Sequence, residues 1–148
     1  MCSSDLGDRL ALDDLARQWP TATVAPVPSR GRTPPALRVV AGPRDDWFAP
    51  DAVARLCATP WQVAAGSNRI GVRLAGPPLP RVRDDELRSE GMLPGALQVP
   101  PAGAPILLLA DHPTTGGYPV LAVVLTADVP LAAQLRPGEV VRFTRSHS

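Results

Sequence analysis

ILLLADHPTTGGYPVLAVVLT, residues 106–126, contains the two most hydrophobic segments of the chain. Ile106–Ala110 and Val120–Thr126 are continuous apolar runs with the length of buried β-strands. The nine residues between them, Asp111–Pro119, exceed what a tight hairpin needs. We therefore predict two core strands, joined by a loop whose length has a functional reason.

Shorter segments of the same kind predict the rest of the fold. Five further strands are expected, at Leu37–Val40, Trp61–Ala65, Val72–Ala75, Ala96–Val99 and Glu139–Thr144. A turn at 66–68 joins the second and third of these into a hairpin, and the charged run 76–90 is expected to be a solvated loop. Short helices are expected at Asp51–Leu56 and Val129–Gln134. Because no long βα alternation appears, the pattern predicts a mainly β fold, an antiparallel β-barrel with two or three short helices.

Composition supports this fold and excludes several functions. The chain has 19 Pro and 12 Gly in 148 residues, which suits many short strands joined by tight turns. Fifteen basic and 14 acidic residues are evenly mixed, so no nucleic-acid partner is expected. No apolar run reaches the length of a membrane span. The two cysteines and two histidines form no metal-ligand pattern, and the sparse cysteines favour a cytoplasmic location.

Residues 1–35 differ in amino-acid composition from the rest of the chain. Five prolines lie between positions 20 and 35, among Thr, Ser, Gly and Arg residues, which is typical of an extended linker. We expect residues 1–35 to be an N-terminal remnant with a proline-rich linker, and residues 36–148 to form one barrel domain.

The long loop carries the main candidates for chemistry. Paired glycines at Gly116–Gly117 allow the backbone to approach a ligand and expose amide groups to an anion. Thr114 and Thr115 add hydroxyls, Asp111 can accept a proton or hydrogen bonds, and Tyr118 offers a ring with a phenol. The same residues also fit an ordinary glycine-rich turn.

Two polar residues elsewhere are further candidates. Arg69 follows the predicted hairpin turn, where it can grip a carboxylate or phosphate or bond to backbone carbonyls of the turn. Gln98 lies on a mostly apolar strand, and a buried amide there needs partners from a ligand or from the backbone.

Four blocks, in this order, resemble a known family. They are SNRIGVRLAGP at Ser67–Pro77, SEGMLPGALQVP at Ser89–Pro100, ADHPTTGGYPV at Ala110–Val120 and AQLRPGEVVRF at Ala133–Phe143. They resemble the biotin-dependent carboxyltransferase-like family, which includes the C subunit of 5-oxoprolinase (PxpC, also KipA) and allophanate hydrolase subunit 2. The resemblance implies two cyclophilin-like β-barrels in tandem, of which residues 36–148 would be the C-terminal one.

The resemblance also implies a function. Members of this family work with a KipI-like B subunit, together with an A subunit, in the ATP-dependent opening of 5-oxoproline to glutamate. Two alternatives stay open. One is the carboxyltransferase part of a biotin-dependent urea carboxylase-type enzyme, and the other is a non-catalytic KipA-type regulator that binds a KipI-like protein.

Carried onto this sequence, the resemblance assigns site residues. Asp111 and Thr115 would be catalytic, with Asp111 as proton acceptor or orienting group. Substrate-binding positions would be Thr114, Gly116, Gly117 and Tyr118, with Ser67, Arg69 and Gln98 as secondary candidates, and no metal ligand is expected. Pro113 departs from the family pattern and removes a backbone donor from the loop. The physical expectation is that Asp111–Pro119 forms a wall of a small-molecule cleft.

Overall fold

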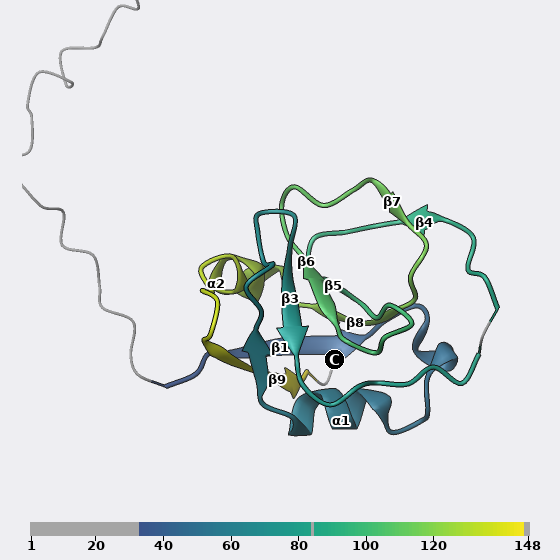
Figure 1. Ribbon diagram of the computed structural model, residues 1–148, viewed down its shortest axis with the longest axis horizontal. Coiled ribbons are helices and arrows are strands. Elements are labelled where there is room, and N and C mark those ends of the chain that lie inside the picture. Colours follow the sequence, from purple (N-terminus) through teal and green to yellow (C-terminus); the bar gives the residue numbers. More distant parts are fainter. Residues whose placement is uncertain (1–32, 84, 147–148) are drawn as a thin grey trace, which may run out of the picture. The chain divides into compact units, whose positions relative to one another are not determined.

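The computed structural model describes residues 33–83 and 85–146. The predicted N-terminal segment 1–35 therefore lies almost entirely outside the described residues, as does His147. Within the described part, the chain forms one β-barrel with its connections (Figure 1).

Seven strands close the barrel in the order β1-β8-β5-β6-β3-β2-β9. Their bounds are β1 Ala36–Ala41, β2 Trp61–Val63, β3 Gly71–Ala75, β5 Ala96–Gln98, β6 Ile106–Leu108, β8 Val120–Val124 and β9 Val140–Arg145. Each matches a strand expected from the sequence, so the predicted mainly β barrel is confirmed. One strand pair differs from the predicted antiparallel barrel: β1 and β9 pair in parallel, with Ala36 beside Arg142.

Two short α-helices and two 3-10 turns complete the barrel. The elements are η2 Asp45–Trp47, α1 Ala52–Ala58, η3 Thr126–Asp128 and α2 Val129–Ala132. Both helices were expected from the sequence, although α2 covers only the first part of the predicted 129–134 helix. Among the described residues, no helix has the length and apolar character to cross a membrane.

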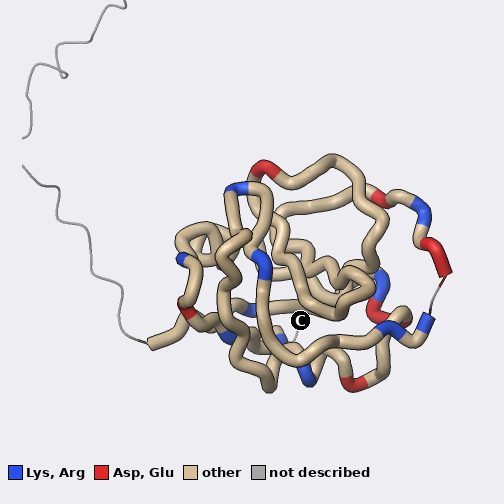
Figure 2. The backbone as a smooth tube through the Cα atoms, in the orientation of Figure 1, with Lys and Arg blue, Asp and Glu red and all other residues tan. Residues whose placement is uncertain are grey.

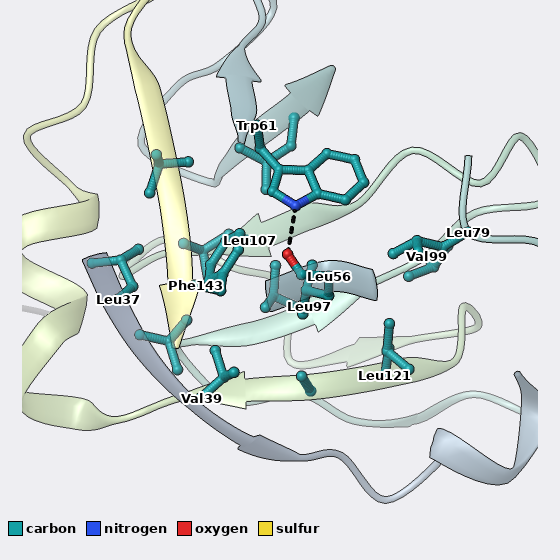
Figure 3. Packing of buried hydrophobic residues seen from close by; sticks show 14 of the residues in the cluster. Leu37, Val39, Leu56, Trp61, Leu79, Leu97, Val99, Leu107, Leu121 and Phe143 are labelled. Atoms are coloured by element: carbon teal, nitrogen blue, oxygen red, sulfur yellow. Dashed lines mark hydrogen bonds between the residues drawn. The ribbon is translucent and has the colours of Figure 1, made fainter. Parts of the chain in front are cut away.

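The barrel interior is filled by one apolar cluster (Figure 3). Trp61 of this cluster is fully buried, and its indole Nε1 donates a hydrogen bond to the Leu56 carbonyl at 2.9 Å. This contact ties α1 to β2. Gly76 lies so close to the indole that an added Cβ would stand 2.7 Å from a ring carbon, so a glycine is required there.

A second, smaller apolar cluster lies on the outer face of the barrel. It contains Met92, Ala96, Leu108 and Val120. Leu97, Leu107 and Leu121 are the neighbours of these strand residues, and they belong to the interior cluster. Since side chains alternate along a strand, the second cluster faces outward. An apolar outer face needs a cover, and a short two-stranded sheet lies next to it.

That sheet pairs β4 (Glu90–Gly91) with β7 (Thr115–Gly116) in antiparallel fashion. We call this pair the flap. It was not expected from the sequence, because two-residue strands carry no alternation pattern. Basic and acidic residues are interspersed along the described chain (Figure 2), in keeping with the even charge balance.

Candidate functional site

The segment Ala110–Pro119 connects β6 to β8 and touches two different regions. At its start lies a pocket of about 330 Å³, which we call the turn pocket. Its lining consists of Ser67, Asn68, Arg69, Val72, Leu109, Ala110, Ala133, Leu135 and Pro137. Further along, the segment becomes strand β7 of the flap.

The polar part of the turn pocket is the β2–β3 turn. Asn68 Oδ1 accepts hydrogen bonds from the amides of Ile70 and Gly71, at 2.9 and 3.3 Å. Ser67 Oγ accepts one from the Arg73 amide at 3.0 Å and donates one to the Arg73 carbonyl at 3.4 Å. The hydroxyl of Ser67 is thus engaged by the backbone, although the residue lines the pocket.

Arg69, which lines the turn pocket, forms an ion pair with Asp111 of the long loop. Arg69 Nε lies 2.8 Å from Asp111 Oδ2, and their side chains are 87% and 49% exposed. The Asp111 amide also donates to the Arg69 carbonyl at 3.4 Å. The structure therefore brings together one candidate from the hairpin turn and one from the long loop, at an ion pair that faces solvent.

Gln98 lies beneath the flap rather than in the pocket. Its side chain is buried, and Nε2 lies 3.1 Å from Met92 Sδ and 3.2 Å from the Tyr118 carbonyl. The sequence left ligand or backbone partners open for this amide. In the structure it donates to the backbone at the end of the long loop.

Gly116 rests directly on this buried amide. A Cβ added there would stand 2.6 Å from Gln98 Nε2 and 3.3 Å from Met92 Cγ, so only a glycine fits without a shift. Gly117 has more room, with the Leu87 carbonyl at 3.6 Å from an added Cβ. Thr114 and Thr115 are exposed, and Tyr118 is 45% exposed.

Two arginines hold the flap region to the barrel. Arg44 forms a two-pronged ion pair with Glu90 of β4, with Nε 3.0 Å from Oε2. The hydrogen bonds from Arg44 lower the pKa of Glu90 below its ordinary value. Arg81 donates to the Val99 carbonyl at 2.8 Å, and its guanidinium lies 5.8 Å from the centre of the Tyr118 ring. Neither arginine was a candidate, since nothing in the sequence distinguishes them from other surface arginines.

The predicted site residues therefore divide into two groups. Ser67 and Arg69 line the turn pocket, and Asp111 is joined to it only through its ion pair with Arg69, whereas Gln98 and Thr114–Tyr118 belong to the flap region. None of the residues Asp111–Pro119, which were expected to form a wall of a cleft, lines the turn pocket. Pocket residues that sequence reasoning did not single out, such as Leu109 and Leu135, lie in or beside the family-like blocks, which was the available signal. No group of His, Cys, Asp and Glu residues suited to a metal ion occurs within 33–83 and 85–146.

Comparison with known proteins defines the class of this barrel. A family model described as "Carboxyltransferase domain, subdomain A and B" matches residues 5–145. The chain belongs to this carboxyltransferase domain family, which confirms the resemblance carried by the four blocks.

Individual relatives within and around this family are similar to the chain over different lengths. The chain is 41% identical over 109 residues to the C subunit of 5-oxoprolinase from Escherichia coli (strain K12), a match that covers 74% of this chain and 35% of the relative. The crystal structure of TTHA0988 superposes with a TM-score of 0.66 at 40% identity, over 80% of this chain and 23% of that one. K. lactis urea amidolyase gives a TM-score of 0.70 at 28% identity, over 76% of this chain and 7% of the other. The chain thus spans about a third of the length of the first relative and less of the others.

Proposed function

We propose that this chain contributes a barrel domain to the C subunit of a cytoplasmic, ATP-dependent 5-oxoprolinase that acts together with its A and B subunits. The observation that carries the proposal is the 41% identity with a protein named as the C subunit of 5-oxoprolinase. Opening of the lactam breaks its C–N bond, and water supplies a hydroxyl to the acyl carbon and a proton to the nitrogen. ATP hydrolysis, in the assembled complex, drives this step.

Within that complex we assign the reacting region to the exposed side of the long loop. Asp111 would accept a proton or orient the substrate, since its carboxylate is half exposed and pairs with Arg69, which lines the turn pocket. Thr115 and Thr114 present exposed hydroxyls, and Gly116–Gly117 together with Tyr118 would line the substrate path. Gln98, buried beneath Gly116, would act on this path through the backbone of Tyr118.

The test is a coupled assay with the A and B subunits and ATP. We expect 5-oxoproline-dependent ATP hydrolysis, and a loss of about 100-fold in the double variant Asp111→Ala, Thr115→Ala, because positioned acid–base groups contribute about that much. The matched control is Asp85→Ala with Thr144→Ala, which removes the same residue types at exposed positions elsewhere. Unchanged turnover in the first double variant would remove Asp111 and Thr115 from the site.

One alternative has structural support. The similarity to K. lactis urea amidolyase, at a TM-score of 0.70, favours a carboxyltransferase domain in a biotin-dependent enzyme that acts on urea. If the chain is instead combined with a biotin carboxylase, biotin and bicarbonate, ATP hydrolysis that depends on urea and does not respond to 5-oxoproline would select this alternative. Stable association with a KipI-like partner without any ATPase response would instead indicate a regulatory role of the KipA type.

A further inference from the structure

The turn pocket has an apolar floor. Six of its nine lining residues have hydrocarbon side chains, so a bound molecule must bring apolar surface to fill it: Val72, Leu109, Ala110, Ala133, Leu135 and Pro137. Val72 and Leu109 are also part of the interior core, with 2% and 4% exposure, so the floor is as rigid as the barrel itself. A volume of about 330 Å³ lies at the small end of the range for ligand pockets.

The lining contains one charged residue, Arg69. The Ser67 hydroxyl and the Asn68 carbonyl oxygen are already used to build the turn. A guanidinium has five N–H donors, and one carboxylate oxygen of Asp111 at 2.8 Å from Nε does not use them all. Arg69 is therefore positioned to take a second oxyanion at the mouth of an apolar pocket.

These two features select the chemistry of the ligand. Urea and inorganic phosphate have no hydrocarbon surface for the floor, and a neutral lactam has no charge for Arg69. A small ring or short aliphatic chain that carries a carboxylate satisfies both. We infer that the turn pocket binds a compact cyclic carboxylate, with its hydrocarbon part on Ala133, Leu135 and Pro137 and its carboxylate on Arg69. The identification of that ligand as 5-oxoproline rests on the proposed function.

The first experiment asks whether the ligand class is right. The 148-residue chain is titrated with four probes, followed by calorimetry or by amide chemical shifts: 5-oxoproline, cyclopentanecarboxylate, 2-pyrrolidinone and urea. We expect both carboxylates to bind at least about tenfold more tightly than the two neutral probes, because each carries a charge that pairs with Arg69. Equal binding of 2-pyrrolidinone and 5-oxoproline, or no binding of either carboxylate, would overturn the inference.

The second experiment asks whether the turn pocket is the place of binding. Arg69→Gln is expected to weaken carboxylate binding at least about tenfold, whereas Arg73→Gln, an exposed arginine on β3 outside the pocket lining, should have no effect. Ala133→Leu, at an exposed lining position, should block binding by filling the pocket, and Ala127→Leu, exposed on η3, is its control. Thermal unfolding of each variant verifies that the fold is intact. If Arg69→Gln and Ala133→Leu bind like the parent chain, the carboxylate lies elsewhere.

The outcomes separate this inference from the proposed function. Suppose that carboxylate binding is sensitive to Arg69 and Ala133, but the protein supports no 5-oxoproline-dependent ATP hydrolysis with the A and B subunits. This result contradicts the proposed function and supports the turn pocket as a carboxylate site. If ATP hydrolysis depends on 5-oxoproline and is unchanged in Arg69→Gln and Ala133→Leu, the inferred binding site is wrong and the proposed function stands.

Discussion

The two ends of the Ala110–Pro119 segment are held in different ways. At its start, Asp111 faces solvent, and its contact is an exposed ion pair with Arg69 beside the turn pocket. At its end, Gly116 lies on the buried amide of Gln98, which also donates to the Tyr118 carbonyl. Both ends carry polar residues that the sequence nominated for ligand binding, yet the turn pocket lies beside the first end.

The difference shows that buried and exposed polar residues have different roles in this barrel. Beneath the flap, the Gln98 amide satisfies backbone and sulfur partners, because an amide buried on an apolar face costs stability unless it is paired. At the turn pocket, the exposed Arg69 and Asp111 cost little to keep and stay accessible to a ligand. The buried Gln98 therefore positions the flap end of the segment, and the exposed ion pair beside the turn pocket is suited to recognition of a ligand.

The largest expected effect tests the flap end. Gly116→Ala places a methyl 2.6 Å from Gln98 Nε2, and overpacking of a buried contact costs about 1–3 kcal/mol, so we expect a loss of about 2 kcal/mol in the free energy of unfolding. Gly91→Ala is the matched control, since an added Cβ there meets nothing within 4 Å and the residue lies opposite Thr115 in the same small sheet. Urea unfolding measures both.

A second variant identifies the contact responsible. If Gly116→Ala destabilises by striking Gln98, the double variant with Gln98→Ala should lose less than the sum of the two single losses, because the removed amide no longer opposes the new methyl. Strict additivity would show that the strain arises elsewhere. Equal losses for Gly116→Ala and Gly91→Ala would show that the flap does not press on Gln98.

A carboxylate outside both regions gives a reference for how much a fully hydrogen-bonded carboxylate contributes to stability. Asp128 is buried at the start of α2 and accepts three hydrogen bonds from Arg38, one from its amide and two from its guanidinium, at 2.7–2.9 Å. Asp128→Asn is expected to cost about 2 kcal/mol near neutral pH, since hydrogen bonds to charged groups are worth about 1.5–3 kcal/mol. This residue shows what a carboxylate fully used by the structure contributes.

The pH dependence of that contribution has a definite sign. The hydrogen bonds from Arg38 lower the pKa of Asp128 from 3.8 to about 2. The stabilisation is therefore complete above the unfolded pKa and is lost as pH falls from 3.8 towards about 2. The gap in unfolding free energy between the parent chain and Asp128→Asn should narrow over this range in urea titrations. A gap that does not change with pH would contradict the assignment.

Much of the barrel could be predicted because its strands are local patterns. Continuous apolar runs such as Val120–Thr126, and the alternation of Val141 and Phe143 with Arg142, identify strands without knowledge of their partners. The parallel pairing of β1 with β9 could not be predicted this way, because it joins the first and last strands of the barrel and depends on how the barrel closes.

The candidate site was predictable only in part, for a related reason. Residue type shows that Gln98, Ser67 and Arg69 need or offer hydrogen bonds, but it does not show which partner takes them. The structure gives the first two to the backbone and the third to Asp111. Arg44 and Arg81 were missed because their partners, Glu90 and Tyr118, come from distant segments of the chain.

The smallest expected effect tests the pocket end. Arg69→Gln should change the free energy of unfolding by less than about 0.5 kcal/mol, because ion pairs this exposed contribute little in water. Thermal and urea unfolding measure this change, with Arg73→Gln as the control for loss of an exposed positive charge on the neighbouring strand. The same variant is expected to lose carboxylate binding, so stability and affinity should separate. A loss as large as that of Asp128→Asn would mean that Arg69 and Asp111 hold the barrel together, and the two ends of the segment would then serve the same structural purpose.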